Sequence, residues 1–207
     1  RQVMEVVLKQ ISNLNFKSDS WLSIAAGLTV TFFENVLGNN QQIIRTIPNT
    51  PASIKKGVTA VYFNRNCKNK TINESILLMK AAGETIIVDD ENLMDAYTAV
   101  SGSGPAYIFY FVEAIISAAK EMGINEKNAR ILAEKTLIGS AYLLENTQSR
   151  AQDLRKAVTS PKGTTEAGLN VLMKKDAFFN LTSRAIQKAQ KRGCLLYTSP
   201  SPRDGLL

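Results

Sequence analysis

Short apolar runs alternate with helical patterns over residues 1–90. The runs are rich in β-branched and aromatic residues and end near glycine or proline, as buried strands do. The predicted strands are Trp21–Ala26, Ile43–Ile47, Val58–Phe63 and Thr85–Val88. Around them, apolar residues recur every three or four positions, which predicts helices at Val3–Ile11, Val30–Leu37 and Ile72–Ala82. This alternation indicates βαβ units and a largely parallel sheet.

The pattern changes after Asp89 and Asp90, because residues 91–192 show no strand pattern. Helical runs follow one another at Leu93–Val100, Tyr107–Met122, Glu126–Leu144, Leu154–Val158, Glu166–Met173 and Phe178–Arg192. We therefore predict an α/β domain over residues 1–90 and an all-α domain over 91–192. Residues 193–207 lack a helical period and are rich in Ser and Pro, so we expect an unstructured tail without a functional role.

The predicted helix Tyr107–Met122 is apolar on more than one face. Such a helix is buried on most sides, which a small bundle achieves with difficulty on its own. Two arrangements fit this pattern: a homodimer that packs these helices together, or a central helix of a single bundle.

Composition limits the chemistry. The 207 residues are 44% apolar, without an apolar run of about twenty residues, so we expect a real core and no membrane span. The start of the chain lacks the layout of a signal peptide. Two cysteines and no histidine give neither a disulfide framework nor a metal cluster, which favours a reducing cytoplasm. Any reaction must therefore use a cofactor, a carboxylate, hydroxyls or backbone groups.

The net charge of +7 is spread along the chain and shows no cluster interleaved with aromatics. This distribution favours a solvated basic surface over nucleic-acid binding, and a phosphorylated cofactor also suits it.

The segment Leu154–Leu172 contains a helix stop and a restart, at the sequence TSPKGTT. Proline ends the first helix, glycine permits a turn, and hydroxyl residues stand at the start of the second helix. Two interpretations fit: ordinary helix capping by the hydroxyls, or an anion site formed by free N–H groups at the helix start.

Three segments together resemble the Δ1-pyrroline-5-carboxylate reductase family, over roughly residues 1–192. They are IRTIPNTP at Ile44–Pro51 with the GVTAVYFN strand after it, LMDAYTAVSGSGPAY at Leu93–Tyr107, and the TSPKGTTEAGL segment. The resemblance implies a Rossmann-type domain followed by an all-α dimerisation domain. It also implies reduction of a cyclic imine to L-proline by NADPH or NADH, the last step of proline biosynthesis. The family begins with a strand and a GxGxxG-like turn, and neither is found here, so the implied Rossmann domain lacks its first βαβ part and the chain is expected to be a fragment.

The resemblance assigns the substrate side of the site. It implies that Ser160, Gly163, Thr164 and Thr165 line the pocket for the substrate carboxylate and ring nitrogen, with Thr165 as a catalytic residue. Glu91 is the carboxylate expected near the substrate and the only one nominated for proton transfer; alternatively, it is a helix-start carboxylate favoured by the dipole. Thr98 and the turn Ser101–Pro105 resemble the segment that closes over the substrate, although Ser103 as an N-cap also explains that turn.

The cofactor side is expected where two predicted strands end, at Ala25, Ala26 and Gly27 and at Asn49, Thr50 and Pro51. Small residues permit a nicotinamide to approach, and Asn49 can bond its carboxamide or order the loop. Alternatively, Asn49 simply forms an Asx-turn. No metal site is expected.

Two other functions stay open on the sequence alone. One is a hydroxyacid-type dehydrogenase with the same domain plan, in which Lys162 would act. The other is a non-catalytic helical dimer module. The partners expected under the main hypothesis are a small-molecule substrate and a second copy of the chain, without nucleic acid or membrane. The resemblance also implies that such dimers can assemble into a higher homo-oligomer.

Overall fold

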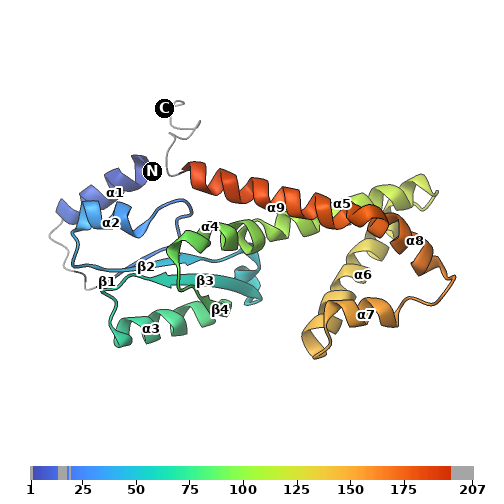
Figure 1. Ribbon diagram of the computed structural model, residues 1–207, viewed down its shortest axis with the longest axis horizontal. Coiled ribbons are helices and arrows are strands. Elements are labelled where there is room, and N and C mark those ends of the chain that lie inside the picture. Colours follow the sequence, from blue (N-terminus) through green and yellow to red (C-terminus); the bar gives the residue numbers. More distant parts are fainter. Residues whose placement is uncertain (1, 14–17, 19, 197–207) are drawn as a thin grey trace. The chain divides into compact units, whose positions relative to one another are not determined.

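A computed structural model describes residues 2–13, 18 and 20–196 (Figure 1). By their contacts, two compact units form: Arg1–Pro105 with Ala185–Leu207, and Ala106–Arg184. The first unit thus includes residues 91–105, which the sequence pattern had grouped with the all-α part. The predicted domain boundary at residue 90 stays a proposal based on pattern.

The first unit contains a four-stranded sheet in the order β1-β2-β3-β4. The strands are β1 (Ser20–Ser23), β2 (Gln42–Ile47), β3 (Gly57–Phe63) and β4 (Gly83–Ile87), close to the predicted positions. The β1–β2 and β3–β4 pairs are parallel, as predicted, but β2 and β3 are antiparallel. The prediction of a largely parallel sheet was wrong at this central pair. Only residues 48–56 join the two strands, whereas a parallel pair needs a crossover of about a dozen residues or more.

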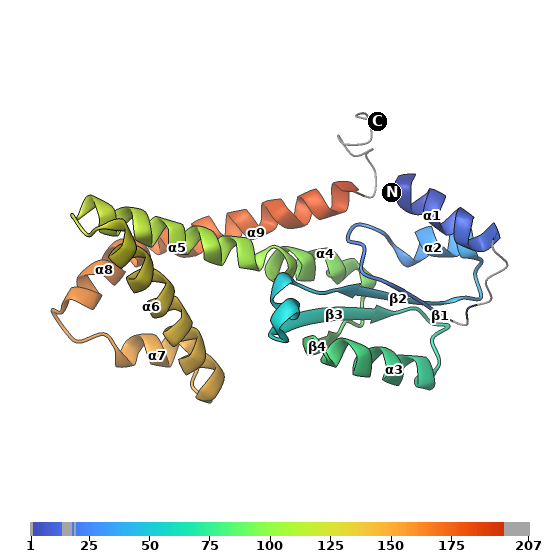
Figure 2. The ribbon, with the colours of Figure 1, turned by 180° about the vertical axis from the view of Figure 1, so that it is seen from behind.

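Helices cover both faces of this sheet. Helices α1 (Gln2–Asn13) and α2 (Val30–Leu37) lie on one side, and α3 (Asn69–Lys80) lies on the other (Figure 1, Figure 2). The core falls into two clusters of buried side chains. One comprises Leu8, Leu28, Val30, Phe33 and Ile43, and the other comprises Ile47, Ala60, Val88 and Met94. The second cluster holds the end of β4 and the start of the following helical segment against β2 and β3.

Thr85 in β4 has a buried hydroxyl without a hydrogen-bond partner among the described residues. A buried hydroxyl that loses its water without gaining a partner destabilises the folded state. We expect Thr85→Val to raise the free energy of unfolding by about 1 kcal/mol, because valine keeps the β-branched shape. Urea unfolding of both proteins checks this, and a lower stability of the valine variant would contradict it.

A short helical segment follows β4. It contains η2 (Glu91–Leu93), α4 (Met94–Tyr97) and a π-helical turn, η3 (Thr98–Gly102), and it continues into α5 (Gly104–Glu121). The remaining helices are α6 (Glu126–Asn146), α7 (Ala151–Ala157), α8 (Thr164–Met173), the 3₁₀ turn η4 (Lys174–Asp176) and α9 (Ala177–Leu196). All the predicted helices are thereby confirmed. Residues 193–196 are helical, unlike the predicted tail, and 197–207 lie outside the described residues.

The second unit buries little of its own apolar surface. In α5 only Val112 and Ala119 are buried, while Phe109 and Tyr110 are 60% and 72% exposed. Other large apolar residues are exposed on the helices of this unit: Ile131, Leu132, Ile138, Tyr142, Val171 and Phe179. Since a single bundle would bury its central helix, the dimer explanation of this pattern is favoured over the central-helix explanation.

Candidate functional site

The turn Ala25–Gly27 follows β1 and precedes α2. Because β1 and β2 are parallel, with Ser23 opposite Arg45, their carboxyl ends lie at the same edge of the sheet. The turn is fixed by the Ser23 side chain, whose Oγ accepts a hydrogen bond from the Ala25 N–H at 3.2 Å. Gly27 is buried and has φ +72°, which glycine adopts without strain. Nucleotides bind at this edge in open α/β sheets.

The loop Asn49–Pro51 follows β2 at the same edge. Asn49 Oδ1 accepts a hydrogen bond from the backbone N–H of Val58 at 2.9 Å, and it makes no capping bond to the following 3₁₀ turn η1 (Thr50–Ile54). Asn49 therefore orders the loop against β3 rather than forming an Asx-turn. Its amide N–H groups have no acceptor within the described residues.

These two segments fit the nicotinamide end of a dinucleotide. They place small residues, a positive-φ glycine and an unused amide donor beside the ends of adjacent parallel strands. If a cofactor binds, residues 25–27 and 49–51 would hold that end.

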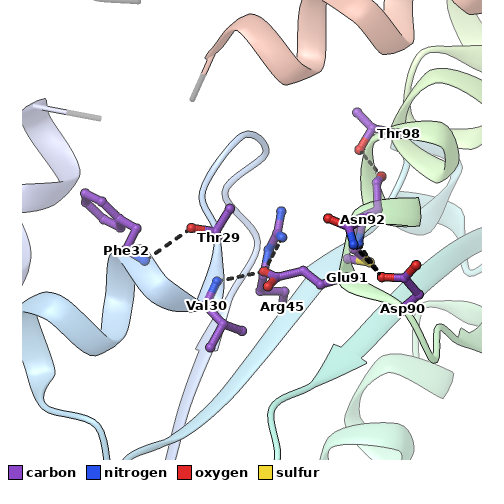
Figure 3. Close-up of polar contacts among 9 residues, drawn as sticks. Thr29, Val30, Phe32, Arg45, Asp90, Glu91, Asn92 and Thr98 are labelled. Atoms are coloured by element: carbon purple, nitrogen blue, oxygen red, sulfur yellow. Dashed lines mark hydrogen bonds and ion pairs between the residues drawn. The ribbon is translucent and has the colours of Figure 1, made fainter. Parts of the chain in front are cut away.

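Glu91 lies at the start of η2, and its carboxylate reaches a different helix (Figure 3). Its Oε1 atom accepts a hydrogen bond from the Val30 N–H, in the first turn of α2, at 2.7 Å. The same oxygen lies 2.5 Å from Nη1 of Arg45 on β2. The capping oxygen of η2 comes instead from Asp90, which accepts a hydrogen bond from the Asn92 N–H. The helix that Glu91 stabilises is thus α2, which follows the Ala25–Gly27 turn.

Arg45 is a residue that the sequence reasoning missed. Its side chain is 2% exposed and lies in the middle of β2, opposite Tyr62 on β3. The available signal was a charged residue inside the apolar run QIIRTI, since an arginine buried in a strand needs a partner. Burial, followed by the charges of Glu91 and Asp90, raises the pKa of Tyr62.

Thr98 begins the π-helical turn, and its hydroxyl donates to the Met94 carbonyl at 2.8 Å (Figure 3). Ser103 has helical backbone angles, and its N–H donates to the Thr98 carbonyl. Ser103 is therefore not an N-cap, and that explanation of the turn is wrong. Short π-helical turns are frequent at functional sites.

The TSPKGTT segment lies in the second unit. Its helix α8 has Gly163 as N-cap, without a side-chain capping bond. In the part of the chain that is described, the hydroxyls of Thr164 and Thr165 neither accept nor donate a hydrogen bond, and the backbone N–H groups of both residues find no acceptor. Both residues are exposed. The two hydroxyls therefore do not cap this helix. The N–H groups and hydroxyls that would bind an anion are available.

The approach to this helix start is tightly folded. Lys162 adopts φ +60°, and its N–H donates to Oε2 of Glu166 at 2.7 Å. Gly163 lies so close to Ser160 that an added Cβ would be 2.5 Å from the Ser160 hydroxyl oxygen. Glycine at 163 thus permits Ser160 and the start of α8 to lie together.

The candidate residues are divided between the two units. The residues at 25–27 and 49–51, with Glu91 and Thr98, lie in the first unit, and Ser160, Gly163, Thr164 and Thr165 lie in the second. Their grouping into one site stays a prediction.

The two cysteines have structural contacts. Cys67 donates to the Ile43 carbonyl and to Asn64 Oδ1, and burial raises its pKa, so no reactive role is indicated. Cys194 donates to Asp95, a contact that raises the pKa of Cys194. Within the described residues, no group of three or more acidic, cysteine or histidine side chains could hold a metal ion.

Comparison with known proteins gives one consistent result. Residues 91–195 match the family model described as "Pyrroline-5-carboxylate reductase dimerisation". The chain is 33% identical over 195 residues to pyrroline-5-carboxylate reductase of Pseudomonas aeruginosa, covering 94% of this chain and 71% of that protein. It is 37% identical to pyrroline-5-carboxylate reductase 1 of Bacillus subtilis, covering 83% of this chain and 57% of the relative.

Solved structures agree. The structure of a pyrroline-5-carboxylate reductase from Coxiella burnetii has a TM-score of 0.86 at 33% identity, over 94% of this chain and 72% of that one. The Plasmodium falciparum pyrroline carboxylate reductase with NADP bound has a TM-score of 0.84 at 27% identity, over 95% and 78%. These structures confirm a Rossmann-type α/β part followed by an all-α part. The chain belongs to the pyrroline-5-carboxylate reductase family.

Proposed function

We propose that this chain is part of a homodimeric reductase that converts Δ1-pyrroline-5-carboxylate to L-proline, the last step of proline biosynthesis, with NADPH or NADH. The names of the relatives support the reaction, and the NADP in the Plasmodium falciparum structure supports the cofactor. The observation that carries the proposal is the start of α8, where Thr164 and Thr165 leave hydroxyls and N–H groups available.

The residues divide the work as follows. A bound nicotinamide supplies the hydride. Residues 25–27 and 49–51 hold its ring end, and the N–H groups at the start of α8 bind the substrate carboxylate. The Thr165 hydroxyl bonds the ring nitrogen, and Glu91 lies beside the substrate as a fixed negative charge. The sequence contains no histidine, so the proton reaches the imine nitrogen from solvent or through hydroxyls.

The direct test measures NADPH oxidation with pyrroline-5-carboxylate. It uses this chain, with the pyrroline-5-carboxylate reductase of Pseudomonas aeruginosa as the positive control. Turnover with pyrroline-5-carboxylate, and none with 2-keto acids, supports the proposal. Turnover with 2-keto acids alone would favour the hydroxyacid-type dehydrogenase. A folded dimer of this chain without saturable NADPH binding would favour the non-catalytic module.

The long apolar helix has two possible partners. The helical stretch Glu91–Glu121 is long and apolar enough to cross a membrane, with 11% of the tested window buried. This is weak evidence for a membrane span, since core helices of soluble proteins have the same properties. The stretch lies inside the segment that matches the dimerisation model. We therefore propose that the exposed apolar surface of this stretch binds a second copy of the chain. The two free thiols further support a cytoplasmic location.

A charge on this surface should prevent dimerisation. Phe109 is 60% exposed in α5, so Phe109→Glu costs the single chain little but places a carboxylate in the interface. We expect the dimer Kd to rise by about 100-fold or more, measured by analytical ultracentrifugation. The matched control is Leu77→Glu, on α3 outside the dimerisation match, where the leucine is 73% exposed. A dimer of unchanged affinity in Phe109→Glu would contradict this assignment.

A further inference from the structure

The contact between Arg45 and Glu91 uses only one of the two carboxylate oxygens. Oε1 of Glu91 receives both the Val30 N–H and Nη1 of Arg45. No contact of Oε2 is present within the described residues. The Glu91 side chain is 23% exposed, while that of Arg45 is 2% exposed. One oxygen is thus held by the sheet and the helix, and the other remains open to a ligand.

Arg45 holds the Glu91 carboxylate rigidly because it lies in a central, fully buried strand. All six residues of β2 are buried, and β2 is paired on both sides, with β1 and β3. A guanidinium fixed in a central strand has little freedom to follow a moving carboxylate, so the carboxylate is held in place instead. The second donor, Val30 N–H, belongs to the first turn of a helix, whose dipole also favours a carboxylate there.

We propose that Arg45 is a positioning residue for the substrate. It fixes Glu91 through Oε1, so that Oε2 forms an ion pair with the protonated ring nitrogen of the imine and of the product amine. This inference rests on the proposed function. In this proposal Arg45 acts on the substrate through Glu91 and does not contact the substrate itself.

Geometry and charge can be separated by the choice of variant. Arg45→Met keeps the length of the side chain and removes the charge and the donor. Arg45→Lys keeps a charge but loses the planar fork that holds a carboxylate at a defined angle. Lys70→Met is the control, because Lys70 pairs with Glu74 at 3.9 Å on the surface of α3 in the same unit and is 84% exposed.

The experiment measures kcat, the KM of each substrate and the melting temperature of this chain and its variants. We expect Arg45→Met to raise the KM for pyrroline-5-carboxylate by about tenfold, because a misplaced carboxylate loses its bond to the substrate. The KM for NADPH should change by less than about twofold. Arg45→Lys should recover part of the loss, and Lys70→Met should behave like the parent protein.

A double variant tests whether Arg45 acts through Glu91. Arg45→Met combined with Glu91→Gln should bind the substrate no more weakly than Glu91→Gln alone, since residues that act as a unit are not additive. Additive losses would overturn the inference, as would a lower melting temperature with an unchanged KM for pyrroline-5-carboxylate. Absence of turnover in the parent protein would instead refute the proposed function, and the inference with it, because Glu91 would then have no such substrate.

Discussion

Replacing Thr165 by alanine should lower kcat/KM for pyrroline-5-carboxylate by about 10- to 100-fold, without loss of stability. A hydrogen bond to a charged group is worth about 1.5–3 kcal/mol, which corresponds to this range in rate. The hydroxyl makes no bond within the described residues, so its removal leaves no buried group unpaired. Alanine also has a higher helix propensity than threonine in α8.

Steady-state kinetics together with thermal unfolding check this expectation. Thr182→Ala is the matched control, because it removes a helical hydroxyl in the same unit whose one hydrogen bond among the described residues goes to the Phe178 carbonyl, one turn earlier. Equal activity of the two variants would show that Thr165 does not contact the substrate. A loss of activity that follows a loss of stability would show that its role is structural.

Most of the fold was accessible from the sequence because periodicity reports burial. The β-branched run at β3 predicts a strand. In α2 and α9, apolar residues recur every three or four positions, which predicts a helix. The direction of β3 relative to β2 was not accessible in the same way. The pattern of apolar and polar residues predicts which side chains are buried, but it does not predict whether two neighbouring strands are parallel or antiparallel. In this case the short connection at 48–56 was the usable signal, because its length excludes a helical crossover.

Some residues of the candidate site could be predicted from the sequence, but their contacts could not. Glu91 could be nominated from the resemblance, but its partners Val30 and Arg45 lie 61 and 46 positions away in the sequence. A local sequence pattern cannot predict a contact between residues so far apart in the chain. For Thr164 and Thr165, local chemistry permitted both capping and anion binding. The structure decides against capping because the N-cap is Gly163. The charged residue Arg45 inside the strand sequence QIIRTI was the sequence signal that pointed to an ion pair.

Replacing Gly83 by alanine should destabilise the protein by about 3 kcal/mol or more, and lower the melting temperature by about 6–12 °C. Gly83 has φ +138° and begins β4 directly opposite Gly57 of β3. A Cβ at residue 83 would lie 2.0 Å from the Gly57 carbonyl oxygen. Since that oxygen belongs to the backbone of the neighbouring strand, it cannot move aside without separating β3 from β4.

Gly38→Ala is the control that separates backbone strain from the clash. Gly38 also has a positive φ, +97°, but a Cβ there would meet no atom of the described residues within 4 Å. We expect it to cost about 1 kcal/mol. Equal losses in the two variants would contradict the steric explanation.

The Gly83 variant should also raise the KM for pyrroline-5-carboxylate. Glu91 follows β4 closely in the chain, and the connection is held to β3 by the Val88 N–H, which donates to the Val61 carbonyl. Gly38→Ala should leave that KM unchanged, since displacement of β4, rather than lower stability as such, is what would move the Glu91 carboxylate.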